Sequence, residues 1–325
     1  MRYIIYGAGA IGGVIGGRLF QAGHDAVLIA RGPHLEAIRE RGLTLETPAE
    51  TTTLPVKAVG HPSEITFGDA DIVVLTMKTQ DTAAALDELR AAAGENIPVI
   101  CAQNGVENER LALRRFARVY AMLVILPATH LEPAVVIAHA APVSGILDAG
   151  RCPTGVDPTI EQVAADFSAC GFSMNAVGEP MRLKYAKLLG NLGNALQAAC
   201  GLDGNLGPLY ARLRDEALAC YHAAGIEYTS DDEMNERRRA MSRPSEAAGG
   251  SRRAGGSSWQ SVARGAGSIE TDYLNGEITL LGRLHGVPTP ANAAMQRIAA
   301  RMVRERMAPG SISAEQIELE IARFA

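Results

Sequence analysis

The feature that most constrains this chain is a glycine-rich turn close to its start. Gly7, Ala8, Gly9, Ala10, Ile11 and Gly12 fit the pattern GxGxxG, between an apolar strand predicted at residues 2–6 and a helix of small residues predicted at 10–21. In such a unit the first glycine permits a tight turn, the second lets the backbone approach a pyrophosphate, and the third lets helix and strand pack closely. The motif therefore predicts a dinucleotide-binding βαβ unit with the pyrophosphate at the helix N-terminus. The alternative is a glycine-rich turn without a ligand.

Arg31 indicates which dinucleotide is bound. It stands at the end of the second predicted strand, residues 25–30, and no acidic residue follows until Glu36. An acidic residue at this place binds the ribose 2′-hydroxyl of NAD, whereas an arginine pairs with the 2′-phosphate of NADP. The planar guanidinium suits a phosphate group. We therefore expect NADPH/NADP, with a solvated arginine as the alternative.

Strand and helix patterns continue to alternate after Arg31. The continuous apolar run Ile72-Val73-Val74-Leu75 is typical of a strand buried on both faces of a parallel sheet. This alternation predicts an α/β, Rossmann-type doubly wound sheet. Further strands are predicted at residues 43–46, 54–58, 71–76 and 97–101, and helices at 34–41, 79–92 and 107–115.

The pattern changes twice in the rest of the chain. Stretches 119–126, 135–140 and 143–147 look like strands that extend the sheet in antiparallel fashion, and a helix at 159–170 and a strand at 173–177 close this domain. After Gly178 the pattern is helical. Because 325 residues exceed what one core usually holds, we predict a Rossmann-like domain at 1–178 and an all-α C-terminal domain at 179–325. Its main helices are predicted at 181–200, 208–224, 268–285 and 291–307.

One segment of the second half has an unusual composition. Residues 242–258 contain only Ser, Arg, Pro, Glu, Ala and Gly. Such a segment buries little surface, which predicts a mobile connection. The other interpretation is a lid over the active site, because the segment leads directly to the candidate residue Ser258.

Bulk properties exclude several classes of protein. The net charge of −5 argues against nucleic-acid binding, and no apolar stretch is long enough to span a membrane. Five scattered cysteines without a CxxC pair indicate a reducing compartment and small buried side chains, so we expect a cytoplasmic protein. The seven histidines do not pair at ligand spacing, and we expect no metal site.

Polar residues recur where an active site would be expected. Lys78 and Asn104 follow the predicted strands 71–76 and 97–101, so both fall at the carboxyl ends of parallel strands, where ligands bind. Lys187, Asn191 and Asn194 share one face of the predicted helix 181–200. Asparagine is a poor helix former, so this stripe suggests a function, although it could simply face solvent.

Glu270 presents a similar choice. On the predicted helix 268–285 it shares a face with Leu274 and Leu281. A buried carboxylate there would need a partner. An exposed glutamate near a helix start would instead interact favourably with the helix dipole.

Taken together, these residues resemble the ketopantoate reductase (2-dehydropantoate 2-reductase) family, over nearly the whole chain. Each motif alone is weak, but the combination is specific. The matching motifs are residues 7–12, Arg31, Thr76-Met77-Lys78, Gln103-Asn104-Gly105, Lys187-Leu188 with Asn191, Ser257-Ser258, and residues 270–276.

The resemblance implies NADPH-dependent reduction of 2-dehydropantoate to pantoate, in pantothenate and coenzyme A biosynthesis. It implies that Lys187 is the general acid, that Asn104 orients it near the nicotinamide, and that Glu270 hydrogen-bonds the new hydroxyl. Second domains of such reductases often dimerise, which makes a homodimer an option. The implied substrate contacts are Ser258, for the carboxylate, and Asn191 and Asn205, for the remaining hydroxyl; the cofactor contacts are residues 7–12, Arg31, Lys78 and Asn104.

The substrate half departs from the family pattern. Ala195 and Leu196 occupy positions where the family usually has asparagine and proline, and Asn194, one residue earlier, could substitute. Residues 259–263 lack a common aspartate and begin with the single tryptophan. Two alternatives therefore stay open. One is a paralogous reductase of another 2-oxo acid, or an opine or 3-hydroxyacid dehydrogenase-like enzyme. The other is a non-catalytic NADPH sensor.

Overall fold

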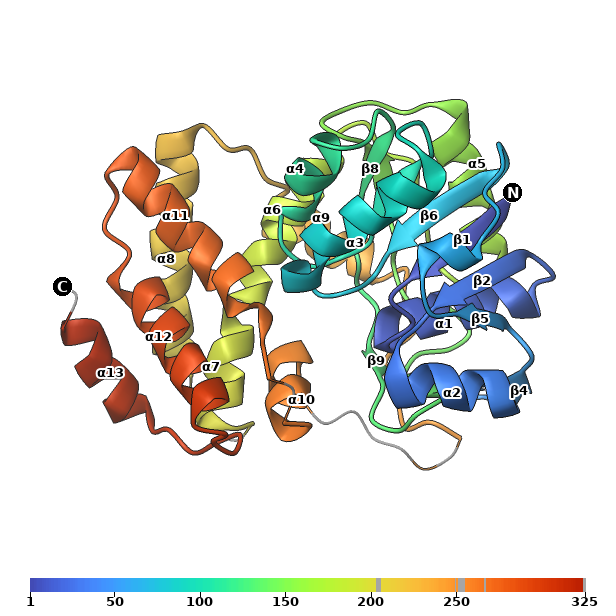
Figure 1. Ribbon diagram of the computed structural model, residues 1–325. Helices are drawn as coiled ribbons and strands as arrows, with labels where there is room; N and C mark the ends of the chain where they lie inside the picture. Colours follow the sequence, from blue (N-terminus) through green and yellow to red (C-terminus); the bar gives the residue numbers. More distant parts are fainter. Residues whose placement is uncertain (203–205, 249, 251–254, 266, 324–325) are drawn as a thin grey trace. The chain divides into compact units, whose positions relative to one another are not determined.

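The computed structural model describes residues 1–202, 206–248, 250, 255–265 and 267–323 (Figure 1). The chain divides into two compact units that interleave in sequence. The first unit comprises residues 1–103, 107–184 and 230–253, and the second comprises 104–106, 185–229 and 254–325. The short segment 104–106, which includes Asn104, thus groups with the second unit although its neighbours on both sides belong to the first.

A seven-stranded sheet forms the centre of the first unit and confirms the predicted Rossmann-type architecture. The strand order is β11-β8-β7-β6-β1-β2-β5. All neighbouring strands are parallel except β11 and β8. The chain leaves β1 toward β2 on one side and returns to β6 on the other, so the topological switch point lies beside β1. The strands are β1 (Arg2–Tyr6), β2 (Asp25–Ile29), β5 (Lys57–Val59), β6 (Asp71–Leu75), β7 (Val99–Cys101), β8 (Val119–Met122) and β11 (Ala149–Arg151).

Helices cover both faces of this sheet. Alternate side chains of the strands join two separate apolar clusters, as a doubly wound sheet requires. One cluster includes residues of α1 (Ala10–Gln21), α2 (Gly32–Arg41) and α5 (Pro158–Ala169), and the other includes residues of α3 (Thr79–Ala93) and α4 (Asn108–Leu113).

A second, four-stranded sheet lies against α1, which corrects the expectation of a single extended sheet. Its strand order is β4-β3-β10-β9. Methyl groups at Gly12 and Gly16 would contact Ile5 and Leu28 of the large sheet, whereas methyl groups at Gly13 and Gly17 would contact strands β10 and β3. The helix is therefore rich in glycine because it is packed between two sheets. The strands are β3 (Leu43–Glu46), β4 (Thr51–Leu54), β9 (Ala128–Thr129) and β10 (Val135–Ala138).

Three predicted strands are wrong in detail. The expected strand at 54–58 is divided between β4 and β5, because Pro55 has no backbone N–H and the Val56 amide turns back to the Leu54 carbonyl (2.8 Å). Segments 143–147 and 173–177 make only isolated bridges, such as those of Ile146 with Ile125 and Ser173. They follow the sheet edge without forming a continuous ladder.

The second unit is helical, as predicted. Most of its helices pack on one another through α11 and α12, which contact each other and α8. Two short helices, η1 (Pro62–Glu64) and α9 (Asp231–Arg238), belong to the first unit. The remaining elements are α6 (Pro180–Asn191), α7 (Gly193–Cys200), α8 (Gly207–Ala224), α10 (Ser257–Ala263), η2 (Glu270–Tyr273), α11 (Asn275–His285), α12 (Pro290–Arg304) and α13 (Ala314–Ala322).

The predicted single helix at 181–200 is interrupted at Leu192. Leu192 nevertheless keeps helical dihedral angles (φ −59°, ψ −29°), and its amide donates to the Leu188 carbonyl (3.2 Å). Its own carbonyl also accepts a hydrogen bond from the side-chain amide of Asn275 (3.2 Å). The Leu189 carbonyl similarly accepts from the Tyr210 hydroxyl (3.3 Å). Asn191 thus ends α6 and Asn194 lies in α7, with one residue of helical backbone between the two elements.

The predicted helix at 268–285 is also divided. Leu274 has φ −112° and ψ −84°, which is not helical, and it separates η2 from α11. Glu270 consequently lies in a 3-10 turn and does not share a helical face with Leu274 and Leu281. The expectation about that face was wrong, while the burial of Glu270 (7% exposed) is clear.

Part of the segment 242–258 is held against the first unit. The amides of Ser242 and Ser245 donate to the carbonyls of Val143 (3.2 Å) and His139 (2.7 Å). The Ala248 amide donates to the Thr47 carbonyl (2.8 Å). Backbone hydrogen bonds therefore fix residues that composition alone assigned to a mobile connection. Residues 249 and 251–254 lie outside the described part of the chain, and 257–258 begin helix α10.

All five cysteines are free. Cys101, Cys170 and Cys220 are buried and the other two are half-buried, as expected for small apolar side chains. Burial raises the pKa of the Cys170 and Cys220 thiols to about 11, which disfavours the reactive thiolate. Among the described helices, none is long and apolar enough to cross a membrane.

Candidate active site

The glycine-rich turn follows β1 at the carboxyl end of the large sheet. Gly7 has φ +106°, and a methyl group there would lie 2.6 Å from the backbone nitrogen of Met77. A methyl group at Gly12 would overlap the Gly7 carbonyl oxygen and the Thr76 hydroxyl. That hydroxyl donates to the Gly7 carbonyl (2.7 Å), which joins the turn to the end of β6. Two of the three glycines are thus required by the protein's own packing.

Gly9 is different, because a methyl group there would meet no atom within 4 Å. Gly9 is the N-cap of α1, has no side chain to cap the helix, and the first turn contains no acidic residue. The first amides of a helix have no intrahelical acceptor and favour an anion. The open space over Gly9 therefore fits a pyrophosphate, the role predicted for the middle glycine.

Arg31 is the N-cap of α2 and its side chain is 75% exposed. Its guanidinium lies 3.4 Å from a carboxylate oxygen of Asp81, in the first turn of α3. Exposed ion pairs of this kind are weak. The guanidinium is consequently available to a phosphate group, with Asp81 as a competing partner.

His34 contributes a contact that the sequence analysis missed. Its Nε2 lies 2.6 Å from the Ala8 carbonyl oxygen, and the Ala134 amide donates to its Nδ1 (2.9 Å). An accepting Nδ1 requires the proton on Nε2, so the neutral ring donates to the glycine-rich turn. Burial lowers the pKa of His34, which favours this neutral form. In the sequence, only its position three residues after Arg31, at the start of α2, could have indicated that His34 lies near the cofactor site.

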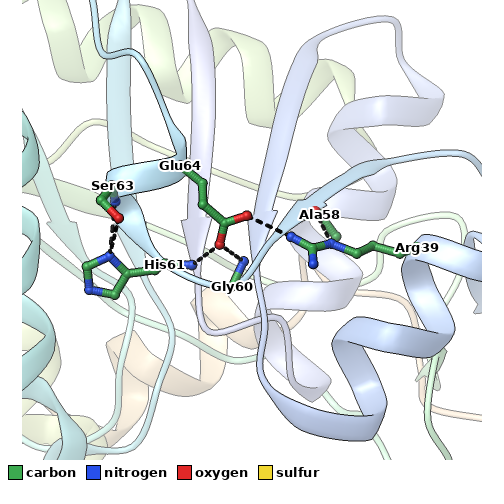
Figure 2. A network of polar contacts seen from close by, with 6 residues as sticks. All are labelled: Arg39, Ala58, Gly60, His61, Ser63 and Glu64. Carbon is green, nitrogen blue, oxygen red and sulfur yellow. Dashed lines mark hydrogen bonds and ion pairs between the residues drawn. The ribbon is translucent and has the colours of Figure 1, made fainter.

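A polar network fixes α2 to the neighbouring strand β5 (Figure 2). Arg39 donates to the Ala58 carbonyl (3.1 Å) and to Glu64 (2.8 Å). The same carboxylate accepts from the amides of Gly60 (2.8 Å) and His61 (3.0 Å). The helix that begins beside Arg31 and carries His34 is therefore held at its far end as well.

Lys78 is the half-buried N-cap residue of α3 and directly follows Met77, which abuts Gly7. The structure thus brings Lys78 to the same edge as the glycine-rich turn. Behind it, Gln103 donates to the Thr82 hydroxyl (2.8 Å), and Thr82 donates to Asn108 (2.8 Å). This buried network holds both ends of the loop that carries Asn104.

Asn104 and Glu270 both lie in the second unit. A methyl group at Gly105 would lie 3.0 Å from the Tyr273 carbonyl oxygen, so the loop after β7 packs against η2. Glu270 opens η2 and is buried, as is the neighbouring Thr271, whose hydroxyl has no hydrogen-bond partner among the described residues. Two of the predicted catalytic residues thus stand on segments in contact.

The remaining polar residues follow on α6 and α7. Lys187 is half-buried, and Asn191, one turn later, is only 4% exposed. The side-chain nitrogen of Asn191 has no hydrogen-bond partner within the described chain. A buried amide without a partner is costly, and a ligand would offset this cost.

The start of α10 lies beside α7. The Gly256 amide donates to Gln197 (2.7 Å), and a methyl group at Gly256 would lie 3.3 Å from the Asn194 side-chain oxygen. Ser258, in the first turn of α10, is buried. The structure therefore brings Asn194 close to the segment of Ser258, whereas Asn205 lies outside the described residues.

Family comparisons agree with this architecture. The model of the family "Ketopantoate reductase PanE/ApbA" matches residues 3–151, and its C-terminal model matches residues 180–303. A crystal structure of a PanE/ApbA family ketopantoate reductase from Ralstonia eutropha is 30% identical, covers 94% of this chain and 99% of its own, and superposes with a TM-score of 0.79. The chain therefore belongs to the ketopantoate reductase family of oxidoreductases.

Two further proteins are similar to this chain over different lengths and at different sequence identities. A 2-dehydropantoate 2-reductase from Pyrococcus horikoshii is 32% identical over 59% of this chain, but the match spans only 61% of that relative. A D-mandelate dehydrogenase solved with NADH and anilino(oxo)acetate has a TM-score of 0.80, 94% coverage of this chain and 99% of its own, at 19% identity. The latter likeness shows a shared fold.

Proposed function

We propose that the protein is an NADPH-dependent 2-oxo acid reductase that converts 2-dehydropantoate to pantoate. The observation that carries this proposal is the buried side-chain nitrogen of Asn191, which has no hydrogen-bond partner among the described residues and lies one turn after Lys187 on α6. A hydroxyl-bearing 2-oxo acid would supply the missing acceptor. Family membership supports the reaction class.

The cofactor half fits a dinucleotide with a 2′-phosphate. The uncapped first turn at Gly9 offers amides and space for a pyrophosphate, and the exposed Arg31 offers a guanidinium for the 2′-phosphate. Lys78 adds a cation at the same sheet edge. When bound, a reduced nicotinamide supplies a hydride.

The residues of this chain would donate the proton and bind the substrate. Lys187 donates a proton to the carbonyl oxygen as negative charge develops there. Asn104 orients Lys187, and Glu270 accepts a hydrogen bond from the product hydroxyl. The substrate carboxylate would bind Ser258, and its other hydroxyl would bind Asn191, Asn194 and Asn205.

A second candidate is reduction of a different 2-oxo acid. Ala195 and Leu196, at positions where the family usually has asparagine and proline, are apolar and both 2% exposed. Trp259, beside Ser258 on α10, adds a large aromatic side chain. The absence of the family's asparagine at Ala195 removes a polar side chain, which favours a less polar 2-oxo acid.

The proposal is tested by following NADPH oxidation with 2-dehydropantoate beside a panel of aliphatic and aromatic 2-oxo acids. Turnover of 2-dehydropantoate with the highest kcat/KM supports the first candidate. Higher kcat/KM for another acid moves the assignment to the second. Tight NADPH binding without turnover of any acid would contradict both and favour a non-catalytic sensor.

A further inference from the structure

A buried ion pair lies one turn before Lys187 on helix α6. Lys184 is 3% exposed and its ammonium pairs with the carboxylate of Glu109, which is 1% exposed. Both residues belong to the first unit. The pair is thus shielded from solvent although it contains two formal charges, and neither residue belongs to the substrate or cofactor contacts proposed above.

Lys184 contacts both ends of the loop that carries Asn104. Its ammonium donates to the Cys101 carbonyl at the end of β7 (3.5 Å) and to Glu109 in the first turn of α4. The loop between these two contacts contains Asn104. On the other side of Lys184, Lys187 follows three residues later on the same helix, about 4.5 Å along its axis.

Stability alone gives a poor reason for this pair. Removing two charges from water costs more than a buried ion pair commonly returns, and an apolar pair of similar volume is often as stable. One carboxylate oxygen of Glu109 has no hydrogen-bond partner among the described residues, so the pair is not fully satisfied. Burial accordingly raises the pKa of the Glu109 carboxyl, against the opposing effect of Lys184. In several proteins, buried polar or ionic groups instead serve to fix the register of packed elements.

We propose that Lys184 and Glu109 are positioning residues that set the register of the Lys187 helix relative to the loop that carries Asn104. This inference rests on the proposed function, in which Lys187 donates the proton and Asn104 orients it. The pair touches the segments on which these two residues stand, and it acts through them. Catalysis depends steeply on such placement, because a misplacement of about 1 Å can cost about 100-fold in rate.

The chain offers a matched control pair. Asp148 (2% exposed) accepts two hydrogen bonds from Arg237 (17% exposed), both at 2.6 Å, and Arg237 also donates to Ser173. This pair also lies in the first unit, with Asp148 buried and Arg237 half-buried, and it connects α9 to segments near the sheet edge. None of these hydrogen bonds involves α6 or the loop between Cys101 and Glu109.

The test replaces each pair with apolar residues of similar volume. In the first double variant, Lys184→Met is combined with Glu109→Leu, and in the control, Asp148→Leu is combined with Arg237→Met. For the first we expect kcat to fall about tenfold or more, with the Kd for NADPH within about twofold of wild type. The control should retain kcat even where its Tm changes. Equal kcat in the wild type and a folded Lys184–Glu109 variant would overturn the proposal.

Two additions keep the test decisive. If the double variant does not fold, Glu109→Gln, which preserves side-chain volume, is judged by the same kcat criterion. Hydrogen exchange of residues 102–108 and 185–191 gives a readout independent of turnover. We expect faster exchange in both segments for the Lys184–Glu109 variants but not for the control. A wild type without turnover would defeat the proposed function alone, and unchanged exchange would then overturn the positioning role.

Discussion

The glycine-rich turn and the region around Lys187 are built in different ways. In the turn, the proposed cofactor contacts are backbone groups: Gly7 and Gly12 pack against Met77 and Thr76, and Gly9 leaves open space at the helix N-terminus. Around Lys187, the proposed contacts are side chains, and residues distant in sequence bond to the same helices, as the Asn275 side chain does at the Leu192 carbonyl. A backbone site is fixed by the fold, whereas a side-chain site can change its substrate while the fold persists.

This difference implies that the two regions control different constants. The turn and Arg31 should determine cofactor affinity, and the Lys187 region should determine the chemical step. Variants that change one constant without the other would support the division. Variants that change both together would show that the two regions act as one site.

Replacement of Lys187 should have the largest effect. Lys187→Ala removes the proposed proton donor, and loss of a positioned general acid costs about 100- to 10,000-fold in kcat. The Kd for NADPH should stay within about twofold, measured by nicotinamide fluorescence. Lys57→Ala, at an exposed lysine of β5, is the control and should behave as wild type. Unaltered kcat in Lys187→Ala would remove this residue from the chemistry.

Replacement of Arg31 should weaken NADPH binding and leave kcat unchanged, the reverse of the effect expected for Lys187. Arg31→Ala removes a charged hydrogen-bond donor to the 2′-phosphate, at a cost of about 1.5 to 3 kcal/mol in NADPH binding. NADH affinity should hardly change, and kcat at saturating NADPH should be retained. Arg39→Ala, on the same helix but bonded to Glu64, is the control. Equal losses for NADPH and NADH would mean that Arg31 does not read the 2′-phosphate.

Substitution at Gly9 separates cofactor contact from folding. Gly9→Ala meets no protein atom within 4 Å, so Tm should equal that of wild type, as for Gly68→Ala in the turn before β6. NADPH affinity should nevertheless fall about tenfold, or about 1.4 kcal/mol, because the methyl group would occupy space needed by the pyrophosphate. Tight NADPH binding by Gly9→Ala would show that the cofactor lies elsewhere.

The same contrast explains what the sequence could predict. The turn, the parallel sheet and Arg31 follow from local pattern, because each depends on neighbouring residues and a regular period. The four-stranded sheet was missed because β10 pairs with β3, far away in the sequence, and its strands are short. Lys184 and Glu109 could not be paired from sequence, since 75 residues separate them and each looks like an ordinary charged helix residue.

The two divided helices could not be predicted from periodicity. The apolar pattern of residues 181–200 is helical throughout, and Leu192 itself keeps helical dihedral angles. Leu274 leaves the helical region although its neighbours fit a helical pattern. Spacing placed Lys187, Asn191 and Asn194 on one face, and the resemblance to a family gave them their proposed roles.

The smallest effect is expected at Asp81, which pairs with Arg31 and would compete with the proposed 2′-phosphate for it. Asp81→Asn removes a negative charge 3.4 Å from the guanidinium, so NADPH should bind more tightly. Exposed ion pairs contribute at most about 1 kcal/mol, and the gain should not exceed about fivefold in Kd. Asp87→Asn, on the same helix but paired with Arg115, should leave the NADPH Kd unchanged. Weaker NADPH binding in Asp81→Asn would instead show that the carboxylate holds Arg31 in the orientation that phosphate requires, so that Asp81 supports the cofactor site and does not oppose it.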